Sequence, residues 1–182
     1  MFPLFDIYER VFTPEECQGL IAWIGEPNQD GVVAKIDTMT DKRVDKNIRS
    51  TRVKFIERLP NEYENVIRDI ILKTKQKNVW NFSTPTREPL QYGVYKEGDH
   101  YDWHHDQKEP GDDGTMRKLS FSLLLNEDYG GGEFEYRDGE KTHTFVLNTG
   151  DMAMFPSFVV HRVKPILHGE RHSLVGWYRG SV

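Results

Sequence analysis

Apolar residues at helical spacing mark two helices in the first half of the chain. Thr13 can cap a helix that begins at Pro14, and Glu16 completes a capping box around its first turn. We expect this helix to run to about Gly25. A second helix is predicted over Asn61–Lys77, because its apolar residues return every three or four positions and form one stripe.

From Pro89 onward the pattern changes to short alternating or apolar runs, separated by Gly, Pro, Asn and Asp. Eight of these runs predict strands: Gln91–Tyr95, His100–His105, Leu119–Leu125, Glu133–Arg137, Thr142–Leu147, Met152–Phe155, His161–Pro165 and Ser173–Tyr178. Two earlier strands are predicted at Gly31–Thr38 and Arg52–Glu57. Strands this short and evenly spaced favour a mainly β fold with flanking helices (α+β), whose core is a double-stranded β-helix, or jelly roll. We expect the two helices to cover one face of it.

The length of 182 residues fits one domain with a buried core. We expect a single domain over residues 1–182, in which residues 89–178 form the jelly-roll core and residues 1–88 support it. The 24 basic and 29 acidic residues give a net charge of −5. That charge argues against a nucleic-acid partner, because affinity for nucleic acid comes mostly from Lys and Arg. Cys17 is the only cysteine, which excludes an intramolecular disulfide and a cysteine zinc site.

The N-terminal residues 1–12 lack a basic region followed by an apolar run and do not resemble a signal peptide. No stretch approaches the roughly 18–20 apolar residues that span a membrane. We therefore expect a cytoplasmic protein in a reducing compartment, without a membrane partner. The sequence leaves the oligomeric state open.

One strand carries side chains typical of a metal site. Side chains alternate between the faces of a strand, so His104 and Asp106 share a face and His105 points the opposite way. A third ligand must come from a distant strand, and His161 lies in an apolar strand 55 residues after Asp106. Two histidines and one carboxylate on one face of a metal are typical of non-haem iron(II) oxygenases. The sequence therefore predicts an iron site at these three residues.

A basic residue follows the candidate metal ligands. Arg171 lies ten residues after His161, and it shares a strand face with Ser173, whereas His172 faces away. An arginine in an apolar strand needs an anion, and its planar guanidinium group suits a carboxylate. Such a pair fits a pocket for a dicarboxylate cosubstrate, with the metal at the 2-oxo acid end and Arg171 at the far carboxylate.

These residues lie in motifs that resemble those of the Fe(II)/2-oxoglutarate-dependent dioxygenases, in their prolyl-4-hydroxylase-like branch. The matching segments are Tyr95-x-x-Gly98-Asp99-x-Tyr101-x-x-His104-x-Asp106, Arg117-Lys118-Leu119-Ser120, Gly131-Gly132-Glu133-Phe134, Gly150-Asp151, Phe155-Pro156, His161-x-Val163-x-Pro165, Gly169-x-Arg171-x-Ser173 and Trp177. The resemblance covers residues 89–178 strongly. It is weaker in the N-terminal half, where it rests on Phe12–Cys17 and Arg49-Ser50.

The resemblance implies a role for the central residues and a reaction. His104, Asp106 and His161 would bind iron(II) and form the catalytic centre, and Arg171 would pair with the C5 carboxylate of 2-oxoglutarate. The cosubstrates would be 2-oxoglutarate and O₂, with ascorbate as a further cofactor. The reaction would hydroxylate a substrate C–H bond and release succinate and CO₂.

The far carboxylate of the cosubstrate needs a second donor, which the resemblance leaves open. Several prolyl hydroxylases have a tyrosine before a Leu-Asn pair that helps the arginine, and here that position is Leu124. Ser173 and Tyr95 are the alternatives. Tyr95 and Tyr101 match pocket tyrosines of the family and would line the cosubstrate site, but they fit ordinary core aromatics equally well.

The substrate follows from the resemblance alone. A prolyl residue in a protein or peptide is the first choice of substrate, although Leu124, in place of the family's tyrosine, weakens the inference of a prolyl substrate from the family. A free amino acid or another small metabolite is the alternative, and the acidic charge disfavours nucleic-acid dealkylation. A non-enzymatic, cupin-like metal-binding protein is the rival from another class. Arg171 discriminates against that rival, because a metal site alone needs no buried guanidinium group.

Residues 38–52 form a charged loop between two predicted strands. From Lys35 to Arg58 there are eight basic and four acidic residues, which is too many for a buried segment. Long loops beside a pocket often close over a substrate, and the family that the chain resembles uses a mobile loop here. A substrate lid and a solvated surface loop both fit this segment.

Overall fold

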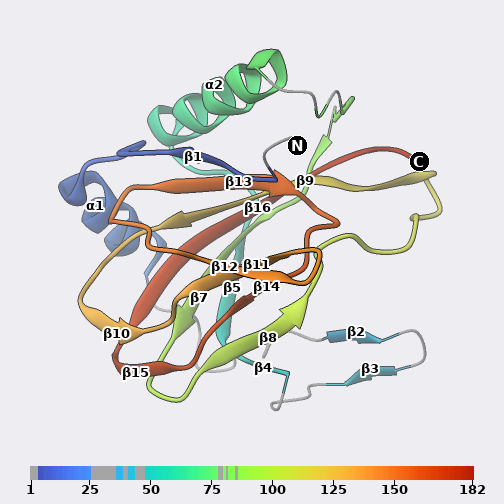
Figure 1. Ribbon diagram of the computed structural model, residues 1–182. Coiled ribbons are helices and arrows are strands. Elements are labelled where there is room, and N and C mark those ends of the chain that lie inside the picture. Colours follow the sequence, from blue (N-terminus) through green and yellow to red (C-terminus); the bar gives the residue numbers. More distant parts are fainter. Residues whose placement is uncertain are drawn as a thin grey trace.

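Two antiparallel sheets face each other in the computed structural model (Figure 1). The structure describes residues 4–25, 36–38, 41–43, 48–77, 80, 82–84 and 86–182. Within them the larger sheet has the order β1 (Asp6–Tyr8), β13 (Met152–Pro156), β9 (Thr115–Leu124), β16 (Arg171–Ser181), β7 (Leu90–Tyr95) and β5 (Arg52–Ile56), with β6 (Thr86–Arg87) also paired to β16. The smaller sheet has the order β12 (Lys141–Phe145), β11 (Phe134–Asp138), β14 (His161–Val163), β8 (His100–His104) and β4 (Arg49–Ser50). The prediction of a mainly β jelly roll is confirmed.

Two short ribbons lie outside these sheets. One pairs β10 (Tyr129–Gly131) with β15 (Ile166–Gly169), and the other pairs β2 (Ile36–Thr38) with β3 (Asp41–Arg43).

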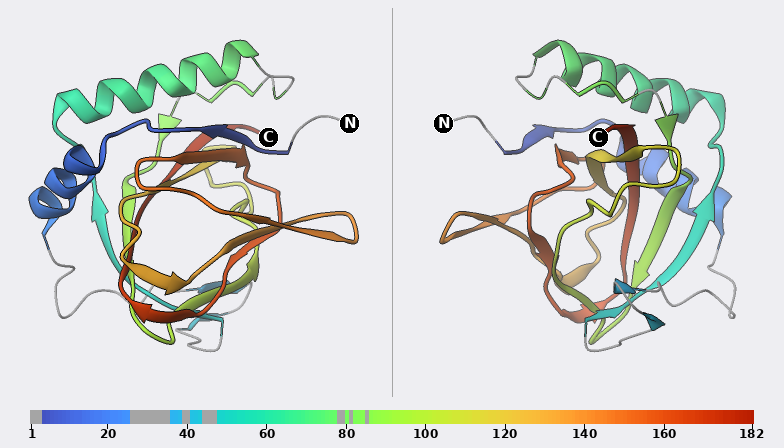
Figure 2. Two further views of the ribbon diagram at one scale, coloured as in Figure 1. Left: turned by 60° about the vertical axis from the view of Figure 1, so that its left-hand side comes forward. Right: turned by 90° about the vertical axis from the view of Figure 1, so that its right-hand side faces the viewer.

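Both helices pack against the outer face of the larger sheet (Figure 2). α1 (Pro14–Ile24) and α2 (Asn61–Lys77) lie where the sequence predicts them. The capping box is present, because the Glu16 amide donates to Thr13 Oγ1 at 3.2 Å and the Thr13 amide donates to Glu16 Oε2 at 2.8 Å. Cys17 is fully buried in the core under α1. In the described part of the chain, no helix is long and apolar enough to cross a membrane.

Strand β9 divides its side chains between two cores. Leu119, Phe121 and Leu123 point to the outer face and pack in the core that contains residues of α1 and α2. Leu124 belongs to a second core, which includes residues of both sheets, and Ser122 lines the pocket described below. The alternation therefore gives the larger sheet an apolar outer face and an inner face with polar positions.

Several strand bounds differ from the predicted ones. The sequence did not predict β1, β3, β4, β6, β10 and β15, which have only two to four residues each and cannot display a period-two pattern. β9 begins at Thr115 instead of Leu119, and β16 extends to Ser181 instead of Tyr178. These added ends are mostly polar, and they form strand because they pair with each other, Ser181 opposite Thr115.

Residues 39, 40 and 44–47 of the charged loop predicted over residues 38–52 lie outside the described residues, so the lid stays a prediction. The predicted strand Gly31–Thr38 is described only at Ile36–Thr38. At the far end of the loop, Arg49 and Ser50 form β4, where Arg49 is opposite Tyr101 of β8. This end of the loop is therefore part of the smaller sheet, and it brings a charged side chain to the interior.

Candidate metal centre and its pocket

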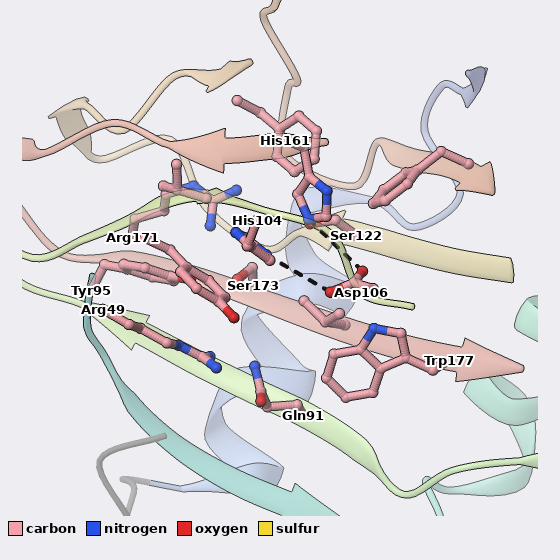
Figure 3. Close-up of a pocket in the computed structure, with 15 residues that line it drawn as sticks. Arg49, Gln91, Tyr95, His104, Asp106, Ser122, His161, Arg171, Ser173 and Trp177 are labelled. Atoms are coloured by element: carbon pink, nitrogen blue, oxygen red, sulfur yellow. Dashed lines mark ion pairs between the residues drawn. The ribbon is translucent and has the colours of Figure 1, made fainter. Parts of the chain in front are cut away.

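A pocket of about 400 Å³, including its open mouth, lies between the two sheets (Figure 3). Its polar lining is Arg49, Gln91, Tyr95, Tyr101, His104, Asp106, Ser122, His161, Arg171 and Ser173. Its remaining lining is Phe134, Phe155, Val163, Val175 and Trp177. All seven residues that the sequence singled out as site residues therefore reach this one pocket.

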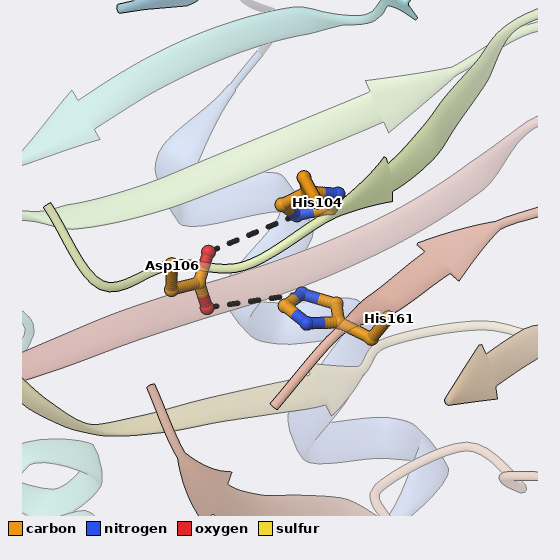
Figure 4. Close-up of side chains that lie close together, drawn as sticks. All are labelled: His104, Asp106 and His161. Atoms are coloured by element: carbon orange, nitrogen blue, oxygen red, sulfur yellow. Dashed lines mark ion pairs between the residues drawn. The ribbon is translucent and has the colours of Figure 1, made fainter. Parts of the chain in front are cut away.

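Two histidines and one aspartate converge in the pocket (Figure 4). His104 ends β8 and His161 begins β14, and the two are direct neighbours in the sheet register. One ligand atom from each histidine and one from Asp106 all lie within 4.8 Å of one another. The Asp106 carboxylate oxygens lie 3.8 Å from His104 Nε2 and 3.8 Å from His161 Nε2. His105, which lies between His104 and Asp106 in the sequence, is exposed, as the sequence predicts.

Backbone carbonyls fix the orientation of both imidazole rings. His104 Nδ1 lies 2.7 Å from the Asp102 carbonyl oxygen, and His161 Nδ1 lies 2.9 Å from that of Val159. A carbonyl oxygen can only accept, so each Nδ1 is the donor. Each Nε2 is then the atom that faces Asp106, as metal-binding histidines require.

Burial and charge set the protonation states of this cluster. Burial lowers the pKa of His104 well below its ordinary value, and the neighbouring His161 lowers it further. Burial raises the pKa of Asp106, but the side chains of His161, His104 and Arg117 outweigh this effect and bring the pKa to about 2. At neutral pH the cluster therefore offers a neutral His104 imidazole and an ionised carboxylate. Asp106 Oδ2 is buried and has no hydrogen-bond partner.

Arg171 lies in the same pocket at the start of β16, opposite Tyr95 of β7 (Figure 3). Its side chain is 2% exposed, and its Nε is buried without a hydrogen-bond partner. None of the ion pairs among the described residues includes it. Ser173 shares its face of β16, whereas His172 points to the other face and contacts the Tyr92 hydroxyl at 2.6 Å. A buried guanidinium group without an anion is costly unless a ligand supplies one.

The two tyrosines of the sequence prediction lie on either side of the pocket. Tyr95 is buried, and the Arg171 Cζ atom lies 5.6 Å from the centre of its ring. The Tyr101 ring stacks on His104 with centroids 3.4 Å apart, and burial raises the Tyr101 pKa to about 12. The Tyr101 hydroxyl group therefore stays protonated and can donate a hydrogen bond. Leu124 faces a second cavity of about 360 Å³, which Arg171 also borders.

Sequence reasoning gave no pocket role to Arg49, Gln91 and Trp177. Trp177 continues the inward face of β16 from Arg171 and Ser173, so the alternation that placed those residues was a signal for it. Its Nε1 is buried without a hydrogen-bond partner, and the Arg117 guanidinium group stacks on its ring at 3.8 Å. Arg49 gave no such signal, because a two-residue strand inside a charged loop has no pattern.

Comparisons with known proteins agree with this geometry. Residues 90–179 match the model of the 2OG-Fe(II) oxygenase superfamily. A PKHD-type hydroxylase of Hyphomonas neptunium is 34% identical over 123 residues, which cover 64% of this chain and 55% of the relative. One of Janthinobacterium sp. is 36% identical over 100 residues, which cover 52% of this chain and 44% of the relative. The chain thus spans about half the length of the curated relatives it matches.

Two solved structures share the fold. A Pseudomonas putida prolyl-4-hydroxylase has a TM-score of 0.74 at 21% identity, over 97% of this chain and 92% of that one. A Trichoplax adhaerens prolyl hydroxylase in complex with a hypoxia inducible factor peptide fragment has a TM-score of 0.76 at 19% identity, over 96% and 83%. The solved structures show that this chain has the fold of the prolyl 4-hydroxylases, and the family match with the curated relatives identifies it as a member of the 2OG-Fe(II) oxygenase superfamily.

Proposed function

We propose that this chain is a hydroxylase in which His104, Asp106 and His161 bind iron(II). The superfamily uses Fe(II), 2-oxoglutarate and O₂, and the residues present fit the metal. The Nε2 atoms of two histidines and an ionised carboxylate converge within 4.8 Å, and the buried Asp106 Oδ2 has no hydrogen-bond partner among the described residues. A divalent cation would offset the cost of that buried charge. When bound, iron with its cosubstrates supplies the oxidising chemistry.

The observation that carries the proposal is Arg171. It is buried and has no acidic partner among the described residues, and it lines the same pocket as the three ligands. Its role is to bind the C5 carboxylate of 2-oxoglutarate, which orients the 2-oxo acid end toward the metal ligands. Ser173 and Tyr95 lie beside it and are our two choices for the second donor. A non-enzymatic metal-binding protein would have no use for this arginine.

The other lining residues shape and dry the pocket. Phe134 stacks on His161 with ring centroids 5.3 Å apart, and Phe155 meets the same ring at 4.8 Å. These two aromatic rings limit the movement of the His161 imidazole and exclude water from the ring faces that they cover. Tyr101 does the same for His104. The protein therefore supplies fixed ligands and a low-dielectric surrounding, within which the cosubstrate and substrate are positioned.

A prolyl residue in a protein or peptide is the substrate that the comparisons favour. The curated relatives are named PKHD-type hydroxylases, and the two similar structures are of prolyl hydroxylases. A free amino acid is the second choice. The net charge of −5 disfavours nucleic acid as a substrate. The single-domain organisation, a cytoplasmic location and a contribution from ascorbate stay predictions.

Turnover of 2-oxoglutarate tests this function. The protein is incubated with iron(II), 2-oxoglutarate and O₂, with and without a panel of proline-containing peptides and free amino acids, and succinate is measured. We expect iron-dependent succinate formation that one class of the panel stimulates, with a mass gain of one oxygen atom in that substrate. If no metal or 2-oxoglutarate dependence appears in folded protein, the hydroxylase assignment is wrong.

A further inference from the structure

Arg49 is a second buried arginine in the same pocket, and neither the metal nor the cosubstrate accounts for it. Its side chain is 6% exposed, and its Nε and Nη2 atoms are buried without a hydrogen-bond partner. Figure 3 shows its guanidinium group pointing into the pocket. Among the described residues, Arg49 and Arg171 are the two buried arginines, and neither forms an ion pair.

The backbone holds Arg49 firmly in this position. β4 pairs with β8, with Arg49 opposite Tyr101, and the Asp102 amide donates to the Ile48 carbonyl at 2.8 Å. The Arg49 Cζ atom lies 4.4 Å from the centre of the Tyr101 ring. This cation–π contact orients the guanidinium plane, but it satisfies none of its N–H groups. An arginine that is buried and oriented in this way is ready to bind an anion.

Charge in the pocket points to the same conclusion. Iron(II), Arg49 and Arg171 together bring one more positive charge than Asp106 and the two carboxylates of 2-oxoglutarate neutralise. In a pocket of low dielectric constant this excess favours a further anion. The second substrate can supply this anion, because Asp106 is the only acidic side chain among the described residues that line the pocket.

The position of Arg49 fits a small substrate group close to the metal ligands. The Tyr101 ring contacts both groups, because the Arg49 Cζ atom lies 4.4 Å from its centre and the His104 ring centre lies 3.4 Å from it. Arg49 Cζ is therefore at most about 8 Å from the centre of the His104 ring, and a hydrogen bond of about 2.9 Å followed by a few carbon atoms of one residue covers such a distance. A carboxylate on Arg49 would therefore leave a carbon of the same residue within reach of the oxidising centre.

We propose that Arg49 binds a carboxylate of the substrate, next to the carbon that is hydroxylated. This inference rests on the proposed hydroxylase function and narrows its substrate class. The carboxylate is that of a free amino acid or of a carboxyl-terminal residue, and an internal prolyl residue flanked by neutral residues lacks it. Two parallel charge-assisted hydrogen bonds from the guanidinium fork would fix the orientation of the substrate.

Binding measurements on inactive complexes test the proposal. Wild-type protein is loaded with Mn(II) and 2-oxoglutarate without O₂, and it is titrated calorimetrically with free amino acids and their amides. The same titration is made with two kinds of peptide. One kind ends in proline, with a free or an amidated carboxyl terminus, and the other has proline at an internal position. We expect the carboxylate form of one ligand to bind about ten- to hundredfold more tightly than its amide. Comparison of the free amino acids with the peptides that end in proline shows which of them supplies the carboxylate.

Variants of Arg49 decide whether this residue is responsible. In Arg49→Gln the preference for carboxylate over amide should disappear, and in Arg49→Lys part of it should remain. Arg52→Gln removes the same charge from an exposed position three residues away, and it should keep the full preference. Thermal melting of each loaded variant checks that it is folded.

The outcomes separate this inference from the function on which it rests. If wild type binds 2-oxoglutarate but no ligand of the panel binds better as its carboxylate, the Arg49 proposal is wrong and the hydroxylase assignment stands. If Arg49→Gln loses affinity for 2-oxoglutarate itself, Arg49 belongs to the cosubstrate site and the proposal is overturned. If wild type does not bind 2-oxoglutarate, the hydroxylase assignment fails as well.

Discussion

Two groups of arginines in this protein have opposite surroundings. Arg117 and Arg179 lie beside Glu88, which accepts from Arg117 Nε at 3.0 Å and from Arg179 Nη1 at 3.1 Å. Arg49 and Arg171 are more deeply buried, and no carboxylate of the described residues contacts either of them. The first group is satisfied within the protein, whereas the second is satisfied only when a ligand brings an anion.

The presence or absence of a carboxylate partner separates arginines that stabilise the fold from arginines that bind a ligand. A buried guanidinium group without a partner costs stability, so its persistence indicates a benefit in binding. The paired arginines connect the neighbouring strands β9 and β16 through Glu88, and the stacking contact of Arg117 supports the Trp177 ring, which lines the pocket. Removing a pocket arginine should therefore affect ligand binding and spare the fold, and removing the Glu88 partner should do the reverse.

The largest effect is expected at the metal ligands themselves. Alanine in place of His104, Asp106 or His161 should abolish iron-dependent turnover, because each change removes one of three ligands. Metal titration and succinate formation measure this, and circular dichroism should show an intact fold. Full turnover in any one of these variants would remove that residue from the metal site.

Arg171→Ala should raise the 2-oxoglutarate concentration needed for half-maximal turnover by about ten- to hundredfold, because a charge-assisted pair is lost. Arg171→Lys should have a smaller effect, since lysine keeps the charge but loses the bidentate geometry. Separate titrations of iron and 2-oxoglutarate check that only the second changes. An unchanged 2-oxoglutarate requirement in Arg171→Ala would place the cosubstrate elsewhere.

Glu88→Ala should lower the free energy of unfolding by about 1–3 kcal/mol, because it leaves Arg117 and Arg179 without their carboxylate. Urea denaturation measures this change, and calorimetry should find 2-oxoglutarate binding little altered. A large loss of 2-oxoglutarate affinity with unchanged stability would contradict the division between the two groups of arginines.

The same carboxylate gives a pH dependence. Burial raises the pKa of Glu88, but Arg117 and Arg179 outweigh it and hold the pKa below its ordinary value of 4.5. A carboxyl group with a lowered pKa in the folded state stabilises the protein above its ordinary pKa and loses this contribution as the pH falls through the lowered value. The difference in stability between wild type and Glu88→Ala should therefore shrink below about pH 4.5. Denaturation of both proteins at pH 7 and at acidic pH measures it.

The smallest effect is expected at His105, which lies between two proposed ligands but is exposed. His105→Ala should keep most of the turnover, because this exposed side chain is not among the residues that line the metal pocket. Steady-state turnover with saturating iron and 2-oxoglutarate measures it. Total loss in a folded protein would assign His105 a role that the geometry does not give it.

Much of the fold could be predicted from the sequence because its patterns are local. The Thr13 capping box fixed the start of α1, and alternation along β16 placed Arg171 and Ser173 in the pocket. Asp106 reaches the same pocket although β8 ends two residues before it, at His104. The short strands could not be predicted, because they exist through pairing with distant strands. Arg49 is the clearest case, since its burial depends on the pairing of β4 with β8 and the sequence places it in a charged loop without a strand pattern.

The most direct test of the central claim removes one binding group of the cosubstrate at a time. Mn(II)-loaded wild type is titrated without O₂ by 2-oxoglutarate, by glutarate, which lacks the 2-oxo group, and by 2-oxobutyrate, which lacks the far carboxylate. We expect glutarate and 2-oxobutyrate each to bind at least about tenfold more weakly than 2-oxoglutarate. Of the three acids, only 2-oxobutyrate should bind Arg171→Ala with the same affinity as wild type. Equal binding of all three acids would contradict a pocket in which the metal centre and Arg171 hold opposite ends of one dicarboxylate.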